Sequence, residues 1–113
     1  MENAIYNELI YRGYSVDVGI VEIRVDEEGK KTRKKLEVDF VINRGNKRYY
    51  IQSAFAMPDE AKVQQEQRPL LLTGDGFKKI IITKDALAPL YNENGVLVMS
   101  IFDFLLDPDS MDK

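Results

Sequence analysis

The side chains best suited to chemistry lie on a hairpin expected near the middle of the chain, over residues 35–55. Antiparallel pairing around its central Gly-Asn turn places Asp39 opposite Gln52 and Glu37 opposite Ala54. Because side chains alternate along a strand, these positions are expected to share one face of the sheet. Carboxylate and amide oxygens are ligands of hard cations such as Mg²⁺ or Mn²⁺. The hairpin is therefore the candidate site. In the alternative interpretation, Asp39 and Gln52 form a cross-strand hydrogen bond that only fixes the register of the hairpin.

The chain contains no histidine and no cysteine, which removes several classes of chemistry. Ser-His-Asp and Cys-His catalysis, zinc ribbons, haem with an axial histidine and disulfide frameworks are all excluded. Carboxylates, lysine, arginine, tyrosine and hydroxyl groups remain, so any bound metal is expected to be oxygen-ligated. A net charge of −3 argues against nucleic-acid binding over the whole surface but allows a local basic patch.

A further acid is expected near the beginning of the chain. Residues 2–12 show helical periodicity, with Ile5 and Leu9 on the same face as Glu2, and Gly13 ends the predicted helix. The apolar face of this helix thus carries a carboxylate in its first turn. A solvated Glu2 that only interacts favourably with the helix dipole is the alternative interpretation.

Alternating and helical patterns predict an α/β domain in which a mixed sheet is flanked by helices. Residues 14–25 alternate as a strand, but the apolar register changes around Gly19, where a β-bulge is expected. A polar helix is expected to start at Pro58 and to stop before Arg68. The later elements are strand 79–83, strand 96–99, helix 101–106 and a fraying tail over residues 108–113. The 113 residues have the size of one domain.

A charged hairpin tip follows the first strand and carries a run of cations. These are Lys30, Lys31, Arg33, Lys34 and Lys35, and they follow the acidic residues 26–28. Their side chains are suited to gripping phosphate, which would make the tip a nucleic-acid-binding surface. A solvated hairpin of mixed charge is the alternative, since no aromatic residue is interleaved with the cations.

The order of elements resembles the PD-(D/E)xK nuclease-like fold, a restriction-endonuclease-like αβββαβ core followed here by a final strand and helix. Nearly the whole chain is similar to the C-terminal domain of unknown function 4143 that follows AAA+ ATPase modules in bacterial and archaeal ATP-binding proteins. The stretches that carry the resemblance are ENAIYNELIYRGYSVDVG, EVDFVI, YYIQSAF, QRPLL, KKIIIT and IFDFLLD. The resemblance implies a single nuclease-like domain over residues 1–113, cut from a longer ATPase whose ATP-binding module is its partner. No GxxxxGK[ST] motif for phosphate binding occurs in this chain.

The resemblance also assigns site positions, and some of them depart from the family pattern. Active nucleases of this fold have a helix acid, a strand Asp and an (Asp/Glu)-x-Lys pair, which correspond here to Glu2, Asp39, Gln52 and Ala54. Mg²⁺ held by the acids polarises the phosphate, and the lysine orients water and stabilises the developing charge. Because Ala54 supplies no such group, the positions are interpreted as vestigial, and no cofactor is expected. Lys62 is the candidate for a displaced lysine, in which case Glu2, Asp39 and Gln52 would hold Mg²⁺.

These observations support several functional hypotheses. The first is a non-catalytic accessory domain of an AAA+-type ATP-binding protein, used for nucleic-acid or protein recognition or for assembly. The second is an active Mg²⁺-dependent deoxyribonuclease that uses Lys62, and the third is a protein-interaction module that forms a homodimer through strand edges. The longest mostly apolar stretch, residues 96–102, is far shorter than the roughly 20 residues that span a bilayer. A cytoplasmic location without a membrane partner is therefore expected.

Overall fold

A computed structural model describes residues 1–27, 29–54, 67–73, 75–84, 89–92 and 94–112. Over these residues the chain forms a mixed α/β fold around a six-stranded sheet, which confirms the predicted α/β class with a mixed sheet. The strands are β1 (Ser15–Glu27), β2 (Lys30–Arg44), β3 (Lys47–Ala54), β4 (Lys78–Thr83), β5 (Leu90–Tyr91) and β6 (Leu97–Ser100). The helices are α1 (Glu2–Tyr11), α3 (Ile101–Leu106) and the 3₁₀ helix η1 (Ser110–Asp112), and residues 67–71 are also helical. No helix in the described part of the chain is long and apolar enough to cross a membrane.

The sheet combines an antiparallel half with a parallel half. Its strand order is β1-β2-β3-β4-β6-β5, in which β1, β2 and β3 pair antiparallel, whereas β3, β4 and β6 pair parallel. The short strand β5, which was not predicted, forms the far edge antiparallel to β6. Residues Ile80, Ile81 and Ile82 of the central strand β4 are fully buried, since apolar clusters cover both faces of the sheet there.

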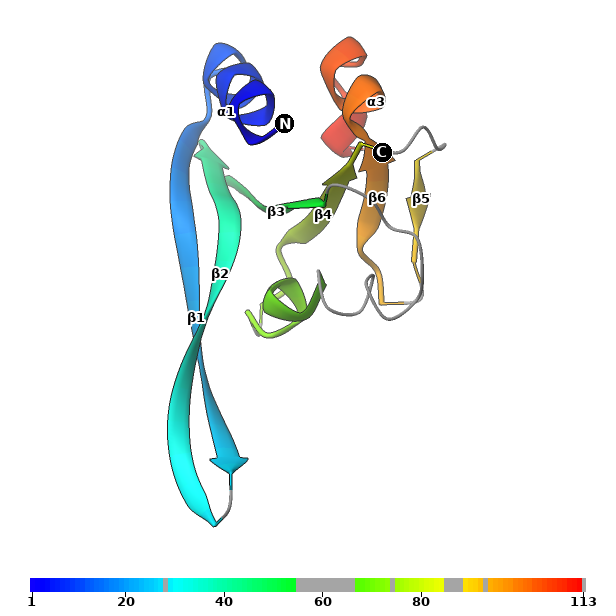
Figure 1. Cartoon of the computed structure of the whole chain (residues 1–113). Coiled ribbons are helices and arrows are strands. Elements are labelled where there is room, and N and C mark those ends of the chain that lie inside the picture. Colours follow the sequence, from blue (N-terminus) through cyan, green and yellow to red (C-terminus); the bar gives the residue numbers. More distant parts are fainter. Residues whose placement is uncertain (28, 55–66, 74, 85–88, 93, 113) are drawn as a thin grey trace.

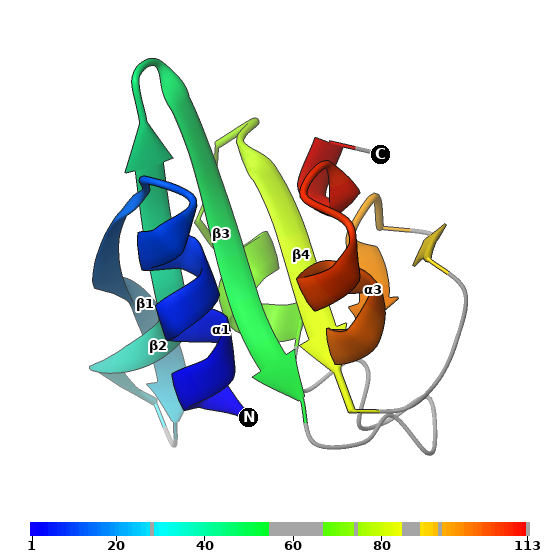
Figure 2. The same cartoon turned by 90° about the horizontal axis from the view of Figure 1, so that it is seen from above.

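Helical segments cover the two faces of the sheet. Figure 2 shows α1 and α3 over one face, where Ile5, Leu9 and Phe104 belong to the larger apolar cluster. On the opposite face, Leu70 from the helical residues 67–71 is fully buried in a second cluster with side chains of β2, β3, β4 and β6. The sheet therefore separates two cores, and each long strand contributes apolar side chains to both of them.

Local signals set the helix ends as predicted. Gly13 follows α1 with a φ of 86°, a left-handed conformation that favours glycine, and its N–H donates to the carbonyl of Ile10 at 3.0 Å. At the other end of the chain, the Ser100 hydroxyl accepts the N–H of Asp103 at 3.1 Å and caps α3. Helix α3 then ends before Asp107, where the following proline disfavours helical backbone.

Beyond the body of the sheet, β1 and β2 continue as a long twisted ribbon (Figure 1). Backbone pairing of β2 with β3 runs only from Phe40–Ile51 to Arg44–Lys47. In contrast, pairing of β2 with β1 continues outward as far as Lys30. The outer half of β2 therefore has β1 as its only neighbour among the described strands.

The segment before β4 differs from the prediction. Residues 67–71 are helical and include Arg68 and Pro69, and the Leu72 N–H donates to the Arg68 carbonyl at 3.2 Å. The predicted stop before Arg68 is therefore wrong, because burial of Leu70 holds this turn against the sheet. The rest of the predicted helix, including Pro58, lies outside the described residues.

The C-terminal residues dock on the body of the protein instead of fraying as predicted. Ser110 and Met111 in η1 are buried, and Met111 joins the cluster covered by α1 and α3. The Tyr49 hydroxyl donates to Oδ1 of Asp112 at 2.6 Å and adds a polar anchor. The polar tail sequence carries no periodic pattern, so only the long-range contact with Tyr49 and the core reveals its position.

Candidate functional site

Strand β2 contains a β-bulge at the predicted site residue Asp39. Beyond the pair Asp17–Val41, the register of β1 against β2 shifts, so that one residue of β1 faces both Asp39 and Phe40. The extra residue therefore lies in β2, and the prediction of a bulge at Gly19 in β1 is wrong about the strand. The bulge places a local kink at the residue on which the predicted site depends.

The apolar pattern of β1 has a different cause from the one predicted. Val16 packs against the cluster covered by α1 and α3, whereas Val21 packs against the cluster on the opposite face. The two apolar registers of β1 therefore serve two cores and need no inserted residue in this strand. Gly19 accommodates the bulge of β2, since a Cβ atom there would lie 2.5 Å from Cγ2 of Val41 and 3.2 Å from Cβ of Val38.

The bulge turns the Asp39 carboxylate toward the face covered by α1. Its Oδ2 accepts hydrogen bonds from the Ser53 hydroxyl at 2.8 Å and from the Ser53 N–H at 2.9 Å. Ser53 shares this face with Ile51, which belongs to the larger core. The side chains of Gln52 and Ala54 point to the opposite face. The expectation that Asp39 shares a face with Gln52 and Ala54 is therefore wrong. The bulge reverses the usual alternation of side chains between the two faces at Asp39.

The Gln52 side chain is built into the sheet. Its Oε1 accepts the backbone N–H of Asp39 at 2.6 Å, and its Nε2 donates to the carbonyl of Glu37 at 3.4 Å. These bonds continue the contact between β2 and β3 past Phe40, where backbone pairing ends. Gln52 is only 6% exposed, so its amide satisfies backbone groups of the bulge in a place that water does not readily reach.

Helix α1 brings the Glu2 carboxylate to the same serine as Asp39. Oγ of Ser53 lies 3.1 Å from Oε1 of Glu2 and 2.8 Å from Oδ2 of Asp39. A hydroxyl carries a single proton, so Ser53 donates to one of these carboxylates at a time. The resemblance had assigned both acids to one site, and the structure brings them together. Ser53 itself was missed, because a serine within a strand carries no motif.

The residues present do not fit the Mg²⁺ site that the resemblance implied. Glu2 and Asp39 meet on one face of the sheet, whereas Gln52 and Ala54 belong to the other. Within the described ranges, no three aspartate, glutamate, histidine or cysteine side chains are grouped closely enough to hold a metal ion. Ala54 is buried among apolar side chains, and Lys62 lies outside the described residues. The described side chains at these positions therefore differ from the ligand set that the resemblance implied.

The cations of the predicted hairpin tip all lie on exposed positions of the ribbon. They are Lys30, Lys31, Arg33, Lys34 and Lys35. The register places acidic residues opposite Lys30, Lys31 and Lys35. It also places Arg24 directly opposite Arg33. A hollow of about 210 Å³ here is lined by Arg24, Lys31, Thr32 and Arg33. Arg24 was missed because it is isolated in the sequence and joins the other cations only through the strand register.

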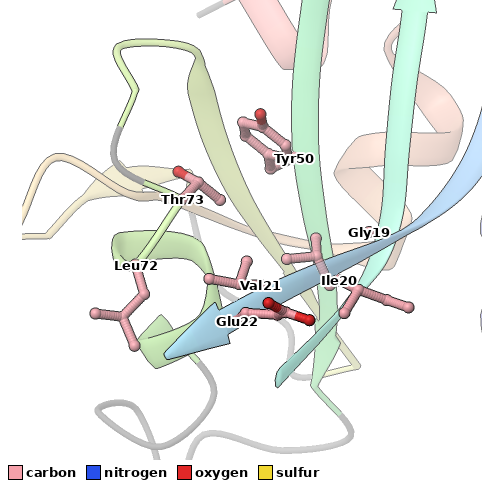
Figure 3. A pocket seen from close by; sticks show the side chains of 8 residues that line it. Gly19, Ile20, Val21, Glu22, Tyr50, Leu72 and Thr73 are labelled. Atoms are coloured by element: carbon pink, nitrogen blue, oxygen red, sulfur yellow. The ribbon is translucent and has the colours of Figure 1, made fainter. Parts of the chain in front are cut away.

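A second hollow of about 330 Å³ lies between the ribbon and the segment that follows the helical residues 67–71 (Figure 3). Its lining is Gly19, Ile20, Val21, Glu22, Val38, Tyr50, Leu72 and Thr73. The Tyr50 hydroxyl donates to Oδ2 of Asp75 at 2.6 Å. Burial, together with this hydrogen bond, raises the pKa of Tyr50. The hydroxyl therefore holds the loop at Asp75, and its raised pKa makes it poorly suited to act as a base.

Comparison with known proteins gives a relative in Haemophilus influenzae whose name is "Uncharacterized protein". It is 32% identical over 109 residues, and the match covers 94% of this chain and 22% of the relative. The chain thus spans about one fifth of that protein. No protein-family model matches the chain, and no solved structure matches it.

Proposed function

We propose that the chain is a non-catalytic accessory domain with a restriction-endonuclease-like fold, within a larger AAA+-type ATP-binding protein in the cytoplasm. Its role in this proposal is recognition of a nucleic acid or a protein, or assembly of the larger protein. The order α1, β1, β2, β3 and the parallel strands β4 and β6 agree with the core expected from the resemblance. The greater length of the H. influenzae relative supports a place within a larger protein.

The position of Gln52 is the observation that carries this proposal. In an active site of the expected type, this residue and Ala54 would face the strand acid and contribute a metal ligand and a lysine. Here the Gln52 amide bonds the Asp39 backbone, and Ala54 fills space in the second core. Loss of one electrostatic contributor typically costs about 10²–10³ in rate, and both contributions are missing at these positions.

The experiment is a cleavage assay on supercoiled plasmid DNA with Mg²⁺ or Mn²⁺, using the wild-type chain, Asp39→Ala and Lys62→Ala. The expected result is that the wild-type chain cleaves no faster than a protein-free control. Cleavage that requires the metal and is lost in a folded Asp39→Ala variant would overturn the proposal. If Lys62→Ala also abolished that activity, the displaced-lysine nuclease would take its place.

A second candidate function, self-association, is favoured by the exposed edge of the sheet. Strand β1 is an edge strand of 13 residues, and Val18 and Ile20 on it are 64% and 61% exposed. Unpaired backbone beside apolar side chains favours antiparallel pairing with β1 of a second copy. Light scattering after size exclusion should then give twice the 13.0 kDa chain mass, and Ile20→Lys should restore the monomer. A monomer at every concentration would rule this candidate out.

A further inference from the structure

We propose that the outer β1–β2 ribbon binds the phosphate backbone of duplex nucleic acid, with Arg24, Lys31 and Arg33 as the contacting residues. This inference rests on the recognition role proposed above and specifies its ligand. It rests on three properties of the ribbon: its projection from the body, its charge arrangement and the hollow between its cations.

The ribbon has a shape that a nucleic-acid groove can accommodate. Figure 1 shows it extending away from the layers formed by the helices and the rest of the sheet. Its two strands pair out to Glu27–Lys30, and β3 no longer accompanies them beyond Phe40. A two-stranded β-ribbon is one of the two elements that the major groove of B-DNA admits, the other being an α-helix. Among the described residues, the outer ribbon therefore projects far enough from the body to approach a duplex.

Most charged pairs across the ribbon are of opposite sign, such as Lys31 with Asp26, but one pair carries like charges. Arg24 and Arg33 are directly paired in the register, and like charges that face each other across two strands are destabilising. Among the residues whose side chains the structure describes, neither arginine forms an ion pair. An anion placed between the guanidinium groups would convert this repulsion into a pair of charge-assisted hydrogen bonds.

The hollow between these residues has the chemistry of a phosphate site. Its described lining consists of Arg24, Lys31, Thr32 and Arg33, which offer guanidinium, ammonium and hydroxyl donors and no carboxylate. A guanidinium group matches the planar spacing of two phosphate oxygens and binds them in a bidentate manner. Arg24 belongs to β1 and Arg33 to β2, so a phosphate bound here would contact both strands of the ribbon.

Two features favour a polymer of phosphates over a single anion. Lys31, Arg33 and Lys35 occupy alternate positions of β2, which places them on one face at intervals of about 6.6–6.8 Å. Cations spaced in this way can contact several phosphates of one backbone at once, which a single anion does not offer. In addition, residues 22–35 contain six cations and four acids, so they carry +2 while the rest of the chain carries −5. Contact is therefore expected through the ribbon alone.

The test is fluorescence anisotropy of a labelled duplex DNA of mixed sequence, titrated with the wild-type chain between about 50 mM and 200 mM salt. Three phosphate contacts predict a slope of about −2.7 in the plot of log affinity against log salt, a loss of roughly 40-fold over this range. The double variant Arg24→Gln/Arg33→Gln should reduce the slope to about −0.9. The matched control Lys47→Gln/Arg68→Gln changes two exposed cations elsewhere and should keep the wild-type slope.

Competitors identify the ligand. Inorganic phosphate at constant ionic strength is expected to displace the duplex poorly, because it offers a single contact, and polyglutamate is expected to compete less well per charge than unlabelled DNA. The proposal is overturned if the chain shows no salt-dependent binding, if both double variants lose affinity equally, or if phosphate or polyglutamate competes as well as DNA. Circular dichroism confirms folding of each variant. Metal-dependent cleavage would instead overturn the non-catalytic function while leaving binding through the ribbon intact, so the two failures are distinguishable.

Discussion

The side-chain oxygen of Gln52 lies 2.6 Å from the backbone nitrogen of Asp39, at the point where β2 and β3 cease to pair through their backbones. This contact lets β2 carry a bulge beside β3 without leaving an N–H group unsatisfied. It also engages the residue that a nuclease of the expected type would need as a metal ligand. The same bond thus supports the fold and agrees with the proposed non-catalytic role.

Replacing Gln52 should therefore reduce stability. Gln52→Met keeps most of the side-chain volume but removes the acceptor, so the Asp39 N–H is left unpaired in a partly buried position. The free energy of unfolding should fall by about 1–3 kcal/mol, as measured by urea titration. Asn7→Leu on the exposed surface of α1 is the control, and its effect should stay within about 0.5 kcal/mol. Equal stability of Gln52→Met and the wild type would show that the bond contributes little.

The bond from Tyr49 to Asp112 should make the protein sensitive to alkali. Burial is the larger cause and this hydrogen bond the second, and together they raise the pKa of Tyr49 above its ordinary value of 10.0. The unfolded chain therefore loses the phenolic proton at lower pH than the folded chain. The resulting stability is complete below pH 10 and declines as the pH rises above it.

The measurement is urea unfolding of the wild type and Tyr49→Phe over a series of pH values that crosses this threshold. At neutral pH, Tyr49→Phe should be less stable by about 1 kcal/mol because the hydrogen bond is missing. Above pH 10 its stability should decline less steeply than that of the wild type. Tyr11→Phe, at a position 86% exposed, should decline as the wild type does. A parallel decline of Tyr49→Phe and wild type would contradict the assignment.

The facing arginines of the ribbon should make the protein less stable than it would be without them. Arg33→Gln removes the repulsion with Arg24 and should raise the free energy of unfolding by about 0.2–1 kcal/mol at low salt. Added salt should shrink this gain, because exposed charges are screened. Thermal unfolding at two salt concentrations measures both effects, with Lys47→Gln as the control for net charge. A loss of stability in Arg33→Gln would mean that the arginine makes a favourable contact within the folded chain.

Met111 should be required for the stability of the whole domain. Its side chain is 1% exposed and belongs to the larger core, so Met111→Ala should cost about 2–5 kcal/mol in urea unfolding. Asp109→Ala changes an exposed neighbour in the same tail and should have an effect within about 0.5 kcal/mol. If Met111→Ala were as mild as Asp109→Ala, the tail would behave in solution as the frayed segment that its sequence suggested.

Features that depend on nearby residues were predictable from the amino-acid sequence. The end of α1 at Gly13, the capping of α3 by Ser100 and the hairpin turn at Gly45 all follow from signals within a few positions. The pairing of β2 with β3 also follows from that turn, because a tight turn leaves a single register in which both strands align. The unbroken apolar run in β4 likewise predicted a strand buried on both faces.

Features that depend on distant residues were decided by the tertiary structure. The bulge at Asp39 arises where β2 meets Gly19 of β1, and it inverts the face on which one side chain lies. The opposition of Arg24 and Arg33 depends on the register beyond that bulge. No pattern within one strand reports such a shift, because a strand that serves two cores and a strand with an inserted residue show the same apolar sequence. Whether β1 or β2 carries the extra residue is determined only by how the two strands pair and pack in the folded protein.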